Sequence, residues 1–257
     1  MTNGKGGGGY NQRKQSRKIE GEKMSNLITK YDYPMEVKLR NFEKYVTRQS
    51  LSRFIARYEL FKMIKDTQGS IIECGVHWGG GIMAYAKLCA GFDLLGLDRK
   101  VIGFDTFEGF PHINVNDKKS APNQLLKVGE FQSFDQIEDE LRDCIKEFDE
   151  NRFINDWGKI ELIKGDACET IPRYIEDNPH TMISLLYLDF DLYEPTKVAL
   201  EYLAPRVVKG GIIAFDEINA KAWAGETIAA LEYFGDFNKC NFRKFPFATG
   251  HSYLIVE

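Results

Sequence analysis

Two apolar runs in this chain end in acidic residues of a kind that could hold a metal ion. One run leads into Asp189 and Asp191, and the other leads into Asp216 and Glu217. Short apolar runs bounded by turn signals are typical of buried parallel strands. Ligands of open α/β sheets bind outside the carboxyl ends of such strands, and carboxylates crowded there repel one another and lose hydration. The pattern therefore favours a hard divalent cation among these acids.

A glycine-rich turn at residues 73–81 forms a second candidate ligand site. The segment has the pattern of a strand end, a tight turn and a helix start, and glycines such as Gly75 and Gly79 let the backbone approach a ligand. The spacing is not GxGxxG, which disfavours a dinucleotide with its pyrophosphate at the helix N-terminus. Glu73, at the start of the turn, suits a cationic or zwitterionic ligand better.

Two further acids follow the next predicted strands. Asp105 ends the second strand, where we expect it to accept a hydrogen bond from a ribose hydroxyl. Asp166 ends the third strand and could accept one from an adenine amine. Together with Glu73, these acids favour an adenosyl ligand without phosphates, namely S-adenosylmethionine. The alternative is that each acid caps the helix that follows it.

The elements that position these residues alternate between strand and helix. This alternation predicts an α/β fold with a mostly parallel, seven-stranded sheet, helices on both faces, and a C-terminal antiparallel hairpin. The expected strands are residues 70–74, 101–105, 160–163, 184–188 and 212–215, followed by the hairpin of residues 241–245 and 252–256.

The chain is expected to have three parts. Residues 1–23 are Gly-rich and basic, with six Lys or Arg against two Glu, and predict a flexible tail. Residues 24–68 are expected to form N-terminal helices that serve as a lid or as oligomer contacts. Residues 69–257 form the ligand-binding domain, in which the polar loop 110–132 is a candidate lid. The apolar stripe of the helix before residue 64 is expected to comprise Leu51, Phe54, Ile55, Tyr58 and Phe61.

Composition narrows the classes of function. Hydrophobic residues make up 43% of the 257 residues and charged residues 28%, as in ordinary globular proteins. The net charge of −4 argues against a dedicated nucleic-acid binder. No apolar run approaches the ~18 residues that a membrane span needs. Five cysteines without CxxC spacing favour free thiols in a reducing cytosol, so we expect a cytoplasmic protein.

At these motifs the chain resembles the macrocin O-methyltransferase (TylF-like) family, which methylates sugar hydroxyls of glycosylated natural products. The matching stretches occur in order between about residues 45 and 235. The most specific of them is Leu-Asp-Phe-Asp-Leu-Tyr-Glu at residues 188–194. The others are residues 73–76 with the glycines that follow, 105–111, 209–211 and 216–217.

The resemblance implies a class I methyltransferase fold, S-adenosylmethionine as methyl donor and Mg²⁺ as cofactor. It implies a small glycosylated acceptor, as in antibiotic or enediyne-type biosynthesis, and a homo-oligomer, since relatives commonly associate. By position, Asp189, Asp216 and Glu217 resemble the metal ligands, and the base is Asp191 or His77. The residues expected to contact the cofactor are Glu73, Gly75, Gly79, Asp105, Thr106, Asp166 and Asp189.

The chain also departs from the family pattern. Glu217 stands where the family commonly has a second Asp, and Phe190 stands where it has Gly. Some relatives carry a basic residue at the position of Leu192, which leaves the base role here to Asp191 or His77. On a regular strand, Asp191 would share a face with Asp189, so that metal and base could act on one hydroxyl.

Three other functions fit parts of the same pattern. A catechol-type O-methyltransferase would use the same metal geometry on an aromatic diol. A nicotinamide-dependent oxidoreductase would share the layer architecture but requires the GxGxxG turn. A non-catalytic adenosyl-binding protein would have no use for acids at both strand ends, since buried unpaired carboxylates are costly.

Overall fold

A computed structural model describes residues 27–119, 122–134, 136–248 and 250–257, so the predicted tail of residues 1–23 lies outside the described part. The chain divides into two compact units, Met1–Ile55 and Ala56–Glu257. The boundary falls inside helix α4 (Arg48–Ile64). The described part of the first unit also carries the short helices α2 (Leu27–Lys30) and α3 (Met35–Leu39).

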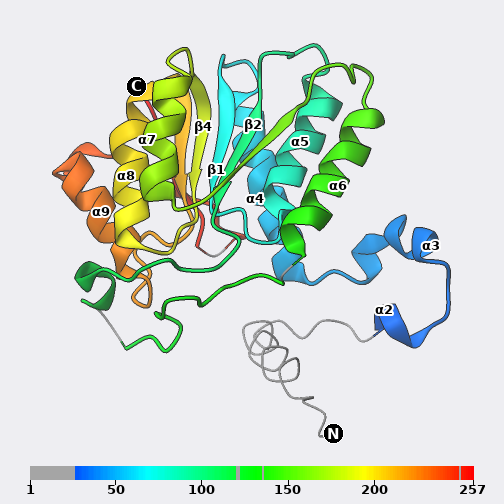
Figure 1. Ribbon diagram of the computed structural model, residues 1–257, viewed down its shortest axis with the longest axis horizontal. Helices are drawn as coiled ribbons and strands as arrows, with labels where there is room; N and C mark the ends of the chain where they lie inside the picture. The colour runs from blue at the N-terminus through cyan, green and yellow to red at the C-terminus, as the bar shows by residue number, and fades with distance from the viewer. Residues whose placement is uncertain (1–26, 120–121, 135, 249) are drawn as a thin grey trace, which may run out of the picture. The chain divides into compact units, whose positions relative to one another are not determined.

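The second unit is built on a sheet that has seven strands within the described residues (Figure 1). Their order is β3-β2-β1-β4-β5-β7-β6. β1 to β5 pair in parallel, β7 is antiparallel to β5, and β6 is antiparallel to β7. The strands are β1 (Ser70–Cys74), β2 (Val101–Asp105), β3 (Ile160–Lys164), β4 (Ile183–Leu188), β5 (Val207–Phe215), β6 (Arg243–Lys244) and β7 (Ser252–Ile255). The predicted mostly parallel sheet with its terminal hairpin is confirmed.

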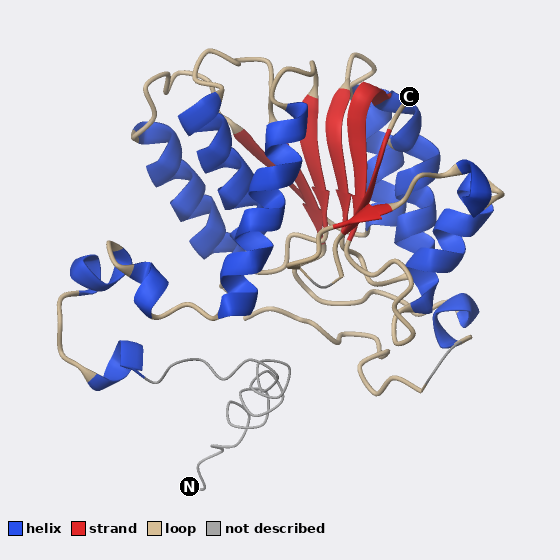
Figure 2. Ribbon diagram, turned by 180° about the vertical axis from the view of Figure 1, so that it is seen from behind, coloured by secondary structure: helices blue, strands red, loops and turns tan. Residues whose placement is uncertain are grey.

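Helices cover both faces of this sheet. In Figures 1 and 2, α4, α5 and α6 lie on one face and α7, α8 and α9 on the other. The helices of this unit are α5 (Gly80–Phe92), α6 (Ile137–Glu150), α7 (Ala167–Asp177), α8 (Tyr193–Tyr202) and α9 (Ala224–Phe234). Short 3₁₀ segments occupy Phe42–Lys44, Val115–Lys118, Ala204–Arg206 and Phe237–Lys239. None of the helices in the described ranges has the length and apolarity to cross a membrane.

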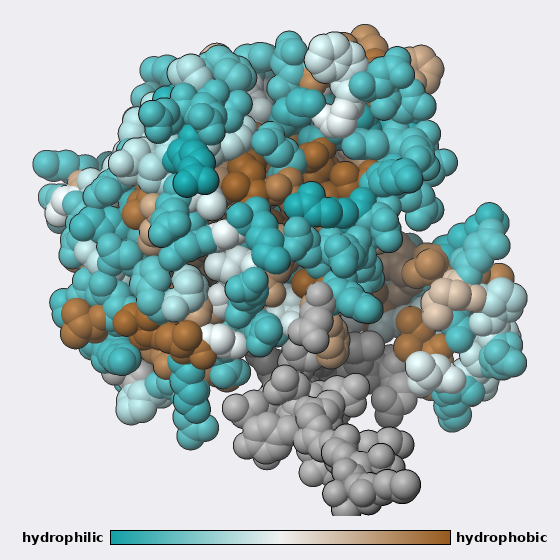
Figure 3. All heavy atoms as spheres, in the orientation of Figure 1, coloured by the Kyte–Doolittle hydropathy of each residue, from teal (hydrophilic) through white to brown (hydrophobic). Residues whose placement is uncertain are grey.

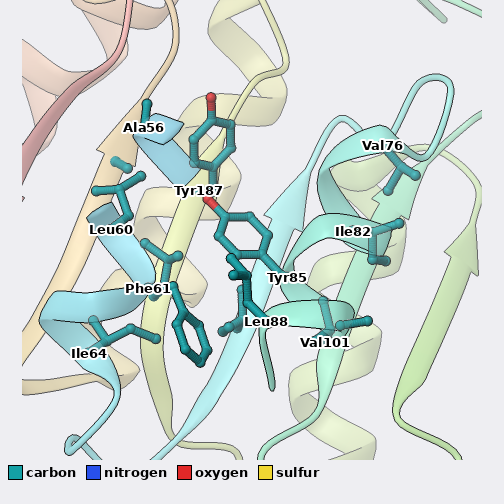
Figure 4. Close-up of a cluster of buried hydrophobic side chains, with 14 of the residues drawn as sticks. Ala56, Leu60, Phe61, Ile64, Val76, Ile82, Tyr85, Leu88, Val101 and Tyr187 are labelled. Atoms are coloured by element: carbon teal, nitrogen blue, oxygen red, sulfur yellow. The ribbon is translucent and has the colours of Figure 1, made fainter. Parts of the chain in front are cut away.

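Each face of the sheet has its own apolar core because alternate side chains of a strand point to opposite faces. Tyr187 packs with α4 and α5, as Figure 4 shows, whereas its neighbours Leu186 and Leu188 pack with α7, α8 and α9. All six residues of β4 are buried. A strand buried on both faces requires the uninterrupted apolar run from which β4 was predicted.

The apolar stripe predicted for α4 is wrong at two positions. Phe54 and Ile55 are 42% and 37% exposed, and the buried face of α4 comprises Ala56, Leu60, Phe61 and Ile64 (Figure 4). α4 carries apolar residues on more than one face, so periodicity alone does not select the buried one. Ala56, 0% exposed, lies on the face that packs.

The strand order places a topological switch point between β1 and β4. From β1 the chain runs to β2 and β3 on one side, and it then returns to β4 and β5 on the other. Ligands of open α/β sheets bind in the crevice outside the carboxyl ends of the strands at such a point. The residues that follow β1 and β4 are Gly75 and Asp189, two of the predicted site residues.

Candidate active site

Gly75 and Asp189 meet at the switch point. The Asp189 N–H donates a hydrogen bond to the Cys74 carbonyl at 2.8 Å, which holds the ends of β1 and β4 together. Gly75 has φ +93°, and a Cβ built on it would lie 2.1 Å from the Asp189 carbonyl oxygen. Only glycine fits this approach, so the predicted glycine turn begins directly against the predicted acidic strand end.

Asp105 ties together the turns that follow β1 and β2. Its Oδ2 accepts a hydrogen bond from the His77 N–H at 2.7 Å, and its Oδ1 accepts one from the Phe107 N–H at 2.6 Å. Burial raises the pKa of Asp105 above its usual range. In the same turn, the Thr106 hydroxyl donates to the Gly109 carbonyl at 2.7 Å. Asp105, Thr106 and His77 are therefore parts of one hydrogen-bonded edge.

Glu73 lies behind this edge, under the first turn of α5. It is 1% exposed, and a Cβ on Gly81 would lie 1.7 Å from its Oε1. The carboxylate accepts a hydrogen bond from the Ile82 N–H, and it lies 3.8 Å from an Arg57 nitrogen of α4. Burial raises the pKa of Glu73 to about 7. Sequence patterns did not identify Arg57, because a lone arginine in an amphipathic helix ordinarily lies on a solvated face.

Asp216, at the end of β5, has two partners on the α4 face of the sheet. Its Oδ1 accepts a hydrogen bond from the Tyr187 hydroxyl at 3.1 Å and lies 3.4 Å from Nδ1 of His251. Burial, and then the charges of Asp216 and Asp191, raise the pKa of Asp189 well above its usual range, while Arg57 acts in the opposite direction. The predicted acids therefore form one electrostatic group.

A further acid, which sequence patterns did not identify, belongs to this group. Glu226 of α9 is 0% exposed, and its Oε1 accepts a hydrogen bond from the Glu217 N–H at 2.9 Å. Burial raises the pKa of Glu226 well above its usual range, and the charges of Asp216, Asp191 and Glu217 add to this effect. No motif marks Glu226, since it lies nine residues beyond the acidic strand end.

The donor set at the ends of β4 and β5 has the chemistry of a site for a hard cation. Carboxylate oxygens are the donors that Mg²⁺ prefers, and Mg²⁺ commonly keeps several waters and takes only one or two carboxylates. In the described part of the chain, these acids do not form a trio with ligand atoms mutually within 4.8 Å, whereas His112, Asp166 and Cys168 do. Direct coordination by Asp189, Asp216 and Glu217 together therefore stays a prediction.

Asp166 caps a helix, as the alternative interpretation of the strand-end acids expected. It is the N-cap residue of α7, and its Oδ1 accepts a hydrogen bond from the Cys168 N–H at 2.9 Å. Its Oδ2 lies 3.5 Å from Nδ1 of His112. A contact between Asp166 and an adenine amine stays a prediction.

Asp191 does not continue the strand. β4 ends at Leu188, and Asp191 has φ +64°, so the expectation that Asp191 and Asp189 share a strand face is wrong. His77, Phe107 and Asn219, which follow β1, β2 and β5, also have positive φ, at 51°, 56° and 65°. Strained backbone of this kind gathers at functional sites. The strain therefore concentrates at the edge of the sheet that carries the acids.

The loop proposed as a lid is partly packed into the protein. Phe110 is buried with Trp223 and Leu192, and Asp117 accepts the Tyr193 N–H at the start of α8 at 2.7 Å. Residues 120 and 121 of this loop lie outside the described part. In Figure 2 the loop runs along the end of the sheet at which the parallel strands terminate. A hollow of about 390 Å³ opens beside the ends of β2 and β3; it is lined by Phe107, Glu108, Gln132, Phe134, Ile137, Glu138 and Lys164.

Comparison with known sequences gives two findings. A family model described as macrocin-O-methyltransferase (TylF) matches residues 46–240. The 8-demethyl-8-(2,3-dimethoxy-alpha-L-rhamnosyl)-tetracenomycin-C 4'-O-methyltransferase of Streptomyces olivaceus is 30% identical over 151 residues, which are 58% of this chain and 52% of that protein. The chain spans about half the length of the curated relatives that it matches.

Comparison with solved structures extends over nearly the whole chain. The crystal structure of CalS11, a calicheamicin methyltransferase, is 29% identical with a TM-score of 0.84 and covers 99% of both chains. The apo structure of CalS11, described as TDP-rhamnose 3'-O-methyltransferase, is 27% identical with a TM-score of 0.75 and covers 97% of this chain and 96% of that one. The predicted class I methyltransferase fold is thereby confirmed.

Proposed function

The chain belongs to the macrocin O-methyltransferase family. We propose that it transfers a methyl group from S-adenosylmethionine to a sugar hydroxyl of a glycosylated small molecule, with Mg²⁺ as cofactor. CalS11, a TDP-rhamnose 3'-O-methyltransferase, and the tetracenomycin-C 4'-O-methyltransferase support a deoxysugar such as rhamnose as the acceptor. Antibiotic or enediyne-type biosynthesis is the corresponding context.

The observation that carries the proposal is the contact between Gly75 and Asp189 at the switch point. The Asp189 carbonyl occupies the space that a side chain at residue 75 would need, so the turn after β1 and the acid after β4 lie directly side by side at the switch point. Methyl transfer from a sulfonium is an in-line displacement, and most of its catalysis comes from holding the acceptor oxygen against the methyl group. A rigid turn beside an acidic strand end suits that task.

Each acid then has a separate role. Asp105 accepts from the ribose hydroxyls, Asp166 accepts from the adenine amine, and the backbone at Gly75 and Gly79 borders the methionine part of the donor. Asp191, held in its strained turn, accepts the proton of the acceptor hydroxyl. His77, whose ring packs edge-on against Trp78 and Phe131, borders the same space.

The cation site uses Asp189, Asp216 and Glu217. A divalent cation bound there would orient the acceptor and lower the pKa of its hydroxyl. The Tyr187 hydroxyl and His251 hold the Asp216 carboxylate in one orientation, which is the support that metal-binding side chains ordinarily receive.

The test combines calorimetry with a turnover assay. S-adenosylhomocysteine should bind, and NAD, the ligand of the oxidoreductase alternative, should not. With S-adenosylmethionine, TDP-rhamnose should be methylated, catechol should not, and a chelator should abolish turnover until Mg²⁺ is restored. Full turnover after exhaustive removal of metal would refute the role of the cation. Preferred methylation of catechol would refute a sugar hydroxyl as the methyl acceptor.

The same proposal includes a cytoplasmic homo-oligomer that associates through the N-terminal helices. The support is a set of large apolar side chains that are 37% to 63% exposed between Leu27 and Ile55. In Figure 3, apolar spheres stand among hydrophilic ones over α2 and α3. Replacing Met35 and Leu39 by Glu should lower the mass measured by light scattering to that of one chain; an unchanged mass would refute this interface.

A further inference from the structure

Glu226 is a buried carboxylate to which the mechanism above gives no role. It lies in the first turn of α9 and is 0% exposed. Its Oε1 accepts the Glu217 N–H, whereas its buried Oε2 has no hydrogen-bond partner among the residues that the structure describes. An unpartnered carboxylate oxygen in a protein interior is costly, so this atom is expected to have a ligand.

Capping of its own helix does not account for Glu226. A Glu at the third position of a helix ordinarily reaches back to the N–H of the N-cap residue, which here is Trp223. The Trp223 N–H donates to the Ala220 carbonyl instead, at 3.1 Å. Glu226 is thus turned away from the end of its helix and toward the residue that follows Asp216.

The main charged groups acting on Glu226 are other acids. Asp216, Asp191 and Glu217 all disfavour its negative charge, and Glu226 in turn disfavours that of Asp189. Five carboxylates therefore share one neighbourhood. A cation among them would relieve this repulsion and would supply the positive charge or the bound water that Oε2 lacks.

A neighbouring carboxylate shows that burial here does not by itself leave an oxygen unpartnered. Asp117 is 2% exposed, and a Cβ on Gly225, the residue before Glu226, would lie 2.1 Å from its Oδ1. Yet Oδ1 accepts the Tyr193 N–H at 2.7 Å and Oδ2 accepts the Asn114 N–H at 2.8 Å. Asp117 is a structural cap with both oxygens paired, and Glu226 is not.

We propose that Glu226 is a positioning residue of the cation site, which accepts a hydrogen bond from a cation-bound water through Oε2 while Oε1 fixes the backbone at Glu217. The inference rests on the proposed Mg²⁺ dependence. Mg²⁺ keeps several waters in protein sites, so Glu226 can contact the ion through one of them. Such an indirect contact suits this site because, in the described part of the chain, its acids do not form a trio with ligand atoms mutually within 4.8 Å.

The test measures Mn²⁺ binding to the protein saturated with S-adenosylhomocysteine, using the electron paramagnetic resonance signal of free Mn²⁺. Glu226→Gln keeps an oxygen for the Glu217 N–H but removes the charge, and it should weaken Mn²⁺ binding about 10- to 100-fold. Its affinity for S-adenosylhomocysteine should not change. Asp117→Asn, the matched control, should bind Mn²⁺ like the wild type, and Asp189→Asn should lose binding.

Wild-type Mn²⁺ affinity in Glu226→Gln, beside loss of binding in Asp189→Asn, would overturn the role of Glu226 and leave the proposed function intact. A wild type that binds no Mn²⁺ would overturn both. If Glu226→Gln does not fold, Glu226→Asp retains the charge but withdraws the carboxylate by one methylene. The rise in melting temperature on adding Mn²⁺ should then be smaller than in the wild type; an equal rise would contradict the inference.

Discussion

Replacing Gly81 by Ala tests whether the buried Glu73 carboxylate supports the glycine turn. The new Cβ would lie 1.7 Å from Glu73 Oε1, so the carboxylate must move. Because Glu73 is 1% exposed and bonds to the Ile82 N–H beside Arg57, it cannot move without breaking these interactions. The substitution therefore leaves a buried acid without its partners.

Two opposing effects determine how much free energy of unfolding Gly81→Ala loses. Above its pKa of about 7, Glu73 is ionised and forms a buried ion pair with Arg57. Breaking such a pair costs about 3–5 kcal/mol, and the separation of 3.8 Å argues for the lower end. Alanine is the better helix former by about 1 kcal/mol. The net loss in the free energy of unfolding is then about 2 kcal/mol, which lowers the melting temperature by roughly 4–8 °C in a chain of this size.

Gly80 provides the matched control. It precedes Gly81 in the same helical turn, and a Cβ there meets no atom within 4 Å. Gly80→Ala should therefore leave the melting temperature unchanged or raise it by up to about 4 °C. Both variants are compared by calorimetry without ligand, at a pH above the Glu73 pKa of about 7. Equal melting temperatures for Gly81→Ala and Gly80→Ala would refute the role given to Glu73.

Three further predictions concern Glu73 itself and two other residues of the site. Burial raises the pKa of Glu73 to about 7 from an ordinary 4.5, so between these pH values the folded state retains a proton that the unfolded chain has released. The free energy of unfolding of the protein should therefore fall by an amount of the order of 3 kcal/mol as pH rises through this window. Denaturant titration should find no such fall in Glu73→Gln. Asp191→Asn should lower kcat about 10²- to 10⁴-fold at unchanged affinity for S-adenosylhomocysteine. Near-normal turnover would show that Asp191 is not the base. Asp105→Asn should weaken S-adenosylhomocysteine binding in calorimetry by about tenfold or more. One of the two carboxylate oxygens that accept backbone N–H groups becomes an NH₂ donor, and the ribose loses a charged partner. Unaltered binding would contradict this role.

The fold was predictable because its central strands β1, β2 and β4 are buried almost throughout. The uninterrupted apolar run of β4 is typical of a strand buried on both faces, and Asp189 follows that run directly. The position of Asp189 and Asp216 at one edge of the sheet then follows from parallel pairing alone. For the same reason, the glycine turn and Asp105 could be assigned to that edge.

The residues that support the site were not predictable in this way. Arg57 meets Glu73 only because α4 packs against β1 and α5, and Glu226 reaches Glu217 only because its side chain turns away from its own helix. Both are contacts between elements, and local patterns do not encode them. The positive φ of Asp191 was not predicted, because hydrophobic periodicity describes regular strands and not the turns that follow them.

The cation site at the ends of β4 and β5 is tested most directly by a crystal structure of the protein with S-adenosylhomocysteine and Mn²⁺, in which anomalous scattering locates the ion. We expect one principal peak, bound by carboxylate oxygens of Asp189 and Asp216, with a water between the ion and Glu226. A peak at His112, Asp166 and Cys168 instead, or carboxylates of Asp189 and Asp216 that share no ion, would contradict the proposed cation site.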